Sequence, residues 1–274
     1  MSCGFQPGQV KVIAFKEFRD RIRSRWVLTM ALVLALFALV IAYFGAAQQG
    51  AVGMAGIEVT LASLVSLVIY LVPLIALVLG FDAIAGERER GSLDLLLSLP
   101  ITRVELLVGK YSGLSMALAV ATLAGFGVAA AVLSFRFDLN AFYHYTAFML
   151  SAVLMGMAFL SIGILVSVLA ADRTQASGIA IGLWFFFVLA YDLVLLGILV
   201  VTKGSFAPDI FPLLLMLNPA DVFRILNIFS LEEVRTLYGL ATVFPEALAN
   251  PWLLGTVMLA WILAPLGIAV WRFK

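Results

Sequence analysis

"GERERGSLDLLLSLPITRVELLVGK" (residues 86–110) carries four acidic and four basic side chains between two long apolar stretches. Ser92 is placed to cap a short helix over "LDLLLSL", and Pro100 ends it because the residue before a proline avoids helical backbone angles. Thr102 and Glu105 have the spacing of a capping box, which predicts a second helix that continues through Lys110. We therefore predict a short amphipathic helix between two sharp corners. The side chains expected to remain available to a partner are those of Glu87, Arg88, Glu89, Arg90 and Asp94.

The chain around this stretch has the composition of a membrane protein. Its 274 residues are 64% hydrophobic and 12% charged, and the mean hydropathy is +1.13. Six apolar stretches are each long enough to cross a hydrocarbon layer of ~30 Å, which needs roughly 20 helical residues. They are continuous, whereas β-barrel strands alternate, so we predict an all-α fold. The expected spans lie near residues 27–47, 60–81, 111–134, 146–170, 179–202 and 251–271.

The positions of the basic residues predict the orientation. If the N-terminus is inside, the inner segments hold 13 of the 17 Lys and Arg residues, while acidic residues divide about evenly. Orientation follows positive charge, so both termini are expected in the cytoplasm. The net charge of +1 gives no indication of nucleic-acid binding. The expected inner segments are residues 1–26, 82–110, 171–178 and 272–274.

The N-terminal segment "QVKVIAFKEFRDRIRSRW" (residues 9–26) is amphipathic rather than membrane-spanning. Phe15, Phe18 and Ile22 share one helical face, and basic residues surround them. This pattern predicts a helix over residues 8–25 that lies in the inner headgroup layer. The alternative is a basic leader that only sets the topology.

The long outer segment, residues 203–250, predicts two short helices. Asn218 and Pro219 begin the first, and Ser230 with Glu233 has the spacing of a capping box for the second. These helices would seal a pore or dock a soluble partner, or the loop is inert. The candidate contact residues there are Asp221, Arg224, Glu232, Glu233 and Arg235. On the inner side, Asp172 and Gln175 predict a cap for the fifth span.

Asp192 is the only charged side chain within an expected span. An intramembrane acid is costly and is therefore a candidate for function, although a structural bond to a neighbouring helix is the alternative. Gly109 and Gly113 match the spacing of close helix contacts, but in a chain with 22 glycines such matches also arise by chance.

Catalytic and metal sites are not expected. The glycines at 86 and 91 lack the lysine of a phosphate-binding loop, so this chain should bind no ATP. His144 is the only histidine and Cys3 the only cysteine, which excludes a two-histidine zinc helix and a thiolate cage. We interpret Met149, Met155 and Met157 as apolar filling rather than copper ligands, because they do not share one helix face. No cofactor is expected on this chain.

Residues 85–110 resemble the signature region of ABC-2 type permeases, where this segment is the coupling helix that fits a groove on the ATPase subunit. The resemblance covers essentially the whole chain, including the surface helix (residues 12–26) and the outer loop (203–250). It implies a single permease domain, residues 1–274, with the six-span fold of the type V exporters. The matching residues are Glu87, Glu89, Gly91, Leu95, Leu96, Pro100 and Lys110. The contacts it implies with the ATPase are made by Glu87, Arg88, Glu89, Arg90, Ser92, Asp94, Pro100 and Arg103.

Within that family the whole chain is most similar to the permease subunits that serve the maturation of nitrous oxide reductase. The resemblance implies a multi-pass protein of the bacterial inner membrane that is itself no enzyme. Its expected partners are a second copy, two cytoplasmic ATPase subunits that bind ATP and Mg²⁺, a periplasmic copper-handling protein and membrane lipid. The alternatives are an exporter of a lipid, glycan or hydrophobic drug, and a passive anchor for accessory proteins.

Overall fold

The computed structural model describes residues 6–44, 57–133, 139–202, 210–228 and 250–273, and these ranges are almost wholly helical. Six helical segments within them are long and apolar enough to cross a membrane, which confirms the predicted all-α membrane class. They are Trp26–Phe44, Thr60–Glu89, Arg103–Val132, Phe142–Leu169, Arg173–Val201 and Pro251–Arg272.

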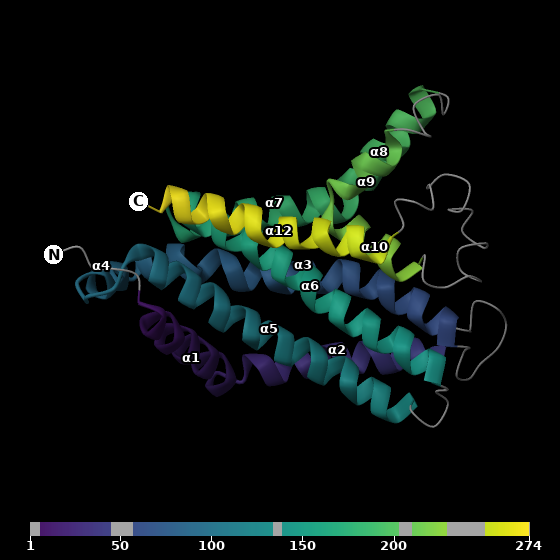
Figure 1. The fold of residues 1–274 in the computed structure, drawn as a ribbon, viewed down its shortest axis with the longest axis horizontal. Coiled ribbons are helices and arrows are strands. Elements are labelled where there is room, and N and C mark those ends of the chain that lie inside the picture. Colours follow the sequence, from purple (N-terminus) through teal and green to yellow (C-terminus); the bar gives the residue numbers. More distant parts are fainter. Residues whose placement is uncertain (1–5, 45–56, 134–138, 203–209, 229–249, 274) are drawn as a thin grey trace.

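Short helices are placed between or before these spans (Figure 1). In chain order the elements are α1 (Pro7–Arg23), α2 (Trp26–Phe44), α3 (Ile57–Glu89), α4 (Ser92–Leu97), α5 (Arg103–Leu133), α6 (Leu139–Leu169), α7 (Arg173–Phe185), a π-helix (Phe186–Ala190), α8 (Tyr191–Val201), α9 (Phe211–Met216), α10 (Pro219–Ile228) and α12 (Pro251–Arg272). The second span was expected near residues 60–81, and α3 continues as a helix beyond it to Glu89. The polar segment between spans two and three is therefore mostly helix.

The centre of the bundle is the contact between α3 and α6. Gly80 and Gly163 face each other there, and a Cβ added to Gly80 would lie 2.9 Å from the Cα of Gly163. Ser167 on α6 adds a polar tie, because its hydroxyl accepts the backbone N–H groups of Ile84 and Ala85 at 2.9 Å. With no side chain between them, the two backbones approach as closely as small residues allow.

The fifth span is interrupted by the π-helix between α7 and α8. Beyond this point α8 diverges from the bundle, whereas α7 lies beside it (Figure 1). α10 packs against α6, where the side-chain amide of Asn227 donates to the Ser151 hydroxyl at 3.0 Å.

The beginning of α1, the whole of α4 and the end of α12 lie at one end of the bundle (Figure 1). The backbone N–H of Gln6 donates to the Glu105 carboxylate near the start of α5. Arg103 lies over the ring of Phe273, 5.6 Å from its centroid. Elements far apart in sequence thus meet at the start of α5, which follows α4 in the chain.

Candidate functional site

α4 is a short helix with one leucine buried against the bundle and another exposed at the surface. Gly91 precedes it with φ +68°, a left-handed conformation that suits glycine and turns the chain away from α3. Leu93 is buried against the bundle, whereas Leu95 is 71% exposed and Asp94 is exposed beside it. The helix therefore offers an apolar and an acidic side chain at the surface.

The predicted cap at Ser92 is wrong. Gly91 occupies the cap position, and the Ser92 hydroxyl instead reaches back to Glu87, 3.0 Å from its carboxylate and 3.3 Å from its carbonyl oxygen. The other predicted cap is confirmed: the Thr102 N–H donates to Glu105 at 2.6 Å, and the Glu105 N–H donates to the Thr102 hydroxyl at 3.2 Å. α4 is thus joined to the end of α3 by side-chain as well as backbone contacts.

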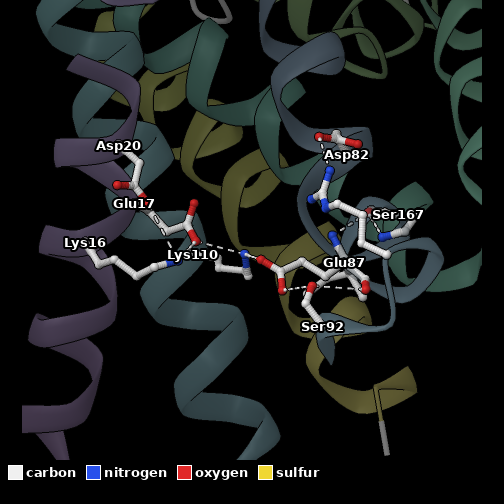
Figure 2. A network of polar contacts seen from close by, with 11 residues as sticks. Lys16, Glu17, Asp20, Asp82, Glu87, Ser92, Lys110 and Ser167 are labelled. Atoms are coloured by element: carbon white, nitrogen blue, oxygen red, sulfur yellow. Dashed lines mark hydrogen bonds and ion pairs between the residues drawn. The ribbon is translucent and has the colours of Figure 1, made fainter. Parts of the chain in front are cut away.

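Lys110 is at the centre of a buried cluster of three charges, the Glu17–Lys110–Glu87 triad (Figure 2). Its ammonium lies 2.9 Å from Glu17 on α1 and 2.8 Å from Glu87 on α3. The three side chains are only 4%, 10% and 12% exposed in the order Lys110, Glu17, Glu87. Charge-assisted hydrogen bonds of this kind are short and strong, so the triad ties three helices together.

A second set of contacts joins the end of α3 to α6 and α7. Asp82 lies 2.7 Å from Arg173 at the start of α7 and 4.0 Å from Arg90. Arg88 donates to the carbonyl of Ala170, just beyond α6. The last turns of α3 are consequently held on both sides, and α4 follows them directly.

The candidate contact residues divide into two groups. In the first group, Lys110 and Ser92 engage the Glu87 carboxylate, and Arg88 donates to the carbonyl of Ala170. Contact of these two residues with an ATPase remains a prediction. The exposed group consists of Glu89, Arg90, Asp94, Pro100 and Arg103.

Sequence reasoning missed Glu17 and gave Lys110 no role beyond the family resemblance. The available signal was weak: Lys110 is the last residue of the expected inner segment, directly before an apolar span, and would need a carboxylate partner only if the fold buried it. Nothing local identified Glu17 as that partner, since 93 residues separate them.

A second charged cluster lies towards the opposite end of the bundle. Arg224 on α10 is 3.0 Å from Asp192 on α8 and 2.6 Å from Asp221. Asp192 therefore has the helix-to-helix bond that was one of its two predicted roles. Glu232, Glu233 and Arg235, together with the capping box at Ser230, lie outside the described residues.

Asn218 fixes the start of α10 as predicted. Its side-chain oxygen accepts the Ala220 N–H at 3.0 Å, while its amide donates to Asp221 at 2.9 Å and to the Phe187 carbonyl in the π-helix at 2.8 Å. The pKa of Asp221 is raised to about 7, chiefly by burial. The positive charge of Arg224 lowers this pKa, and the negative charge of Asp192 raises it further. One arginine is thus shared between two carboxylates.

Neither cluster has the composition of a metal site. Among the described residues, no group of three or more His, Cys, Asp or Glu side chains is placed to hold a metal ion. Met155 is buried in the core and Met149 and Met157 pack against it, as apolar filling would.

Comparison with known proteins extends over nearly the whole chain. A family model described as "ABC-2 family transporter protein" matches residues 11–274. The "Probable ABC transporter permease protein NosY" of Stutzerimonas stutzeri is 41% identical over 270 residues, covering 97% of this chain and 98% of that protein. Its namesake in Pseudomonas aeruginosa is 43% identical over 271 residues, with the same coverage of both. The similarity therefore includes α1, α4 and all six spans.

Proposed function

The chain belongs to the ABC-2 family of transporter permeases, and from this we propose that α4 is the coupling helix through which a separate ATPase moves the spans. The permease itself is the non-catalytic membrane subunit. The observation that carries the proposal is that α4 is exposed at its tip yet bonded at its base to α3. A push on Leu95 would therefore reach the second span without passing through a flexible link.

We further propose that this subunit serves the assembly of the copper centres of nitrous oxide reductase. The support is similarity over nearly full length to two proteins named NosY. In this proposal two copies of the chain, with α4 in the cytoplasm of a bacterial cell, associate with two ATPase subunits that bind ATP and Mg²⁺. Movement passes along the spans to α10, which relays it to a periplasmic copper-handling protein.

The test of the coupling role is a substitution at the tip of α4. Leu95→Asp should weaken association with the ATPase by about tenfold or more, because a few central anchors dominate the affinity of an interface. Tyr143→Ser is the control, since Tyr143 is 69% exposed but lies near the start of α6, away from α4. Co-purification from membranes measures both. Equal recovery of ATPase with the two variants would refute the proposal.

Export of a lipid or hydrophobic molecule is the second candidate. It is favoured by a cavity of about 260 Å³ with mostly apolar walls between α8, α9 and α10. The apolar lining includes Leu195, Leu196 and Phe211, and the charged cluster of Asp192, Asp221 and Arg224 also borders the cavity. Copper content of the reductase, measured in cells with and without the intact permease and ATPase, separates the candidates. Loss of copper loading favours maturation, whereas full loading without ATP hydrolysis favours export or a passive anchor.

A further inference from the structure

We propose that the surface helix α1 is a working part of the coupling device, and that Glu17 and Lys110 are positioning residues that determine where α4 lies. This inference rests on the proposed function of α4. It extends that function to a helix whose sequence indicates only an interfacial element or a topology signal.

α1 is packed on α5 without space between them. A Cβ added to Gly113 would lie 2.4 Å from the Ala14 carbonyl oxygen, and one added to Gly109 would lie 2.7 Å from Ile13. Backbones this close form a rigid pair rather than a helix resting loosely on its neighbour. Val12, Phe15 and Ile22 remain exposed on another side of α1, as expected for contact with lipid.

The triad connects this rigid pair of α1 and α5 to the base of α4. A buried ammonium is costly unless carboxylates surround it, and Lys110 has one from α1 and one from α3. If Glu17 loses its charge, Lys110 retains only Glu87 and is free to shift towards it. The position of Glu87, and of the Ser92 hydroxyl bonded to it, therefore depends on a carboxylate on α1.

The same connection gives α4 a direct route to two helices. Displacement of α4 pulls on Glu87, which either carries Lys110, α5 and α1 with it or breaks a buried ion pair (Figure 2). Because breaking a buried pair is unfavourable, movement of the three elements together is the easier path. α1 thus moves together with the coupling helix. Because α1 lies at the membrane surface, it also limits how far the coupling helix can move.

The first experiment measures the position of α4 in the permease alone. In a Cys3→Ser background, spin labels at Leu95 on α4 and Arg19 on α1, both exposed, report the distance between the helices in lipid nanodiscs. Glu17→Gln should broaden the distance distribution about twofold or add a second population, and Glu17→Asp should restore part of the original. Asp20→Asn is the matched control, because it removes the same charge from α1 at a side chain that is 57% exposed and pairs with the exposed Lys16, 3.6 Å away, rather than with Lys110. A Glu17→Gln distribution identical to the control would overturn the inference.

The second experiment measures coupling in the complex with the ATPase. Glu17→Gln should lower permease-dependent ATP turnover by about tenfold, equivalent to ~1.4 kcal/mol, with an unchanged KM for ATP. Asp20→Asn should retain the wild-type turnover. If wild-type permease binds no ATPase, the proposed function fails while the spin-label result still stands. If the wild type is coupled and Glu17→Gln matches it, only the role of α1 is refuted.

Discussion

Of the three triad residues, Lys110 should contribute most to stability through its charge, because it neutralises both carboxylates. Lys110→Met keeps most of the side-chain volume but removes the buried cation between the two carboxylates: Glu87 loses its ion pair, and Glu17 retains only the exposed Lys16, 3.6 Å away. We expect a loss of about 3–5 kcal/mol in the free energy of unfolding, as found when one partner of a buried ion pair is removed. Denaturation of the purified protein in detergent measures this loss. Lys11→Met, at an exposed position of α1, should change the value by less than about 0.5 kcal/mol.

Asp221 should make stability depend on pH. Its pKa is raised from 3.8 to about 7, so the folded protein holds a proton that the unfolded chain releases between these values. Stability is therefore fully present below about pH 4, falls as the pH rises towards 7 and is constant above that, with a total decline of ~2–4 kcal/mol. Thermal unfolding from pH 4 to 8.5 measures the decline. In Asp221→Asn it should disappear, and an unchanged slope would show that another group titrates.

The roles of some of these residues could be predicted from their neighbours in the sequence. The roles of the others depend on contacts between residues far apart in the chain. The caps at Thr102, Asp172 and Asn218 follow from rules that span a few residues, and the structure contains each of them. The Glu17–Lys110 pair joins residues far apart in the chain, so only the fold brings it together. Ser92 was misjudged because Glu87, its actual partner, precedes it by five residues, beyond the reach of a capping rule.

The contact between α1 and α5 predicts opposite effects for two glycines of one helix. Gly113→Ala places a methyl group against the Ala14 carbonyl and should destabilise the protein by about 1–3 kcal/mol. Gly127→Ala has no atom within 4 Å of the new Cβ and should be neutral or stabilising by up to ~1 kcal/mol. Unfolding midpoints of the two variants measure the difference. Equal midpoints would mean that α1 yields to the methyl group and is not tightly packed.

The helices themselves were the most predictable elements, since long apolar stretches permit little else in a membrane. The ends of the helices were less predictable. α3 extends to Glu89 because its charged last turns find partners on α5, on α7 and at Ala170, just beyond α6. The break in the fifth span was not expected. Its sequence is continuously apolar up to Asp192, and the bond from Asn218 to the Phe187 carbonyl comes from a distant element.

The orientation of the whole molecule can be tested with its own cysteine. If both termini are cytoplasmic, a membrane-impermeant maleimide should label Cys3 in inside-out vesicles and leave it unlabelled in intact spheroplasts. Trp252→Cys in a Cys3→Ser background should show the reverse, because Trp252 is 85% exposed at the start of α12, which the predicted topology places at the opposite membrane surface. Labelling of both positions from one side would refute the six-span topology.

The two charged clusters are connected by a closely packed part of the bundle. Between the triad and Arg224 lies the contact of α3 with α6, where Gly80 meets Gly163. Densely packed interiors transmit displacement rather than absorb it. A movement that begins at α4 therefore passes through closely packed helices until it reaches α6, against which α10 packs.

The π-helix sets the rotational phase of everything that follows it in the fifth span. A π-helix has more residues per turn than an α-helix and therefore turns the chain by less than about 100° per residue, so converting residues 186–190 to regular α-helix without removing any residue would rotate α8 by several tens of degrees. Asp192 would then face away from Arg224, although no charged residue had been altered. A change of helix type at this one turn would therefore break the same ion pair as a charge mutation at Asp192.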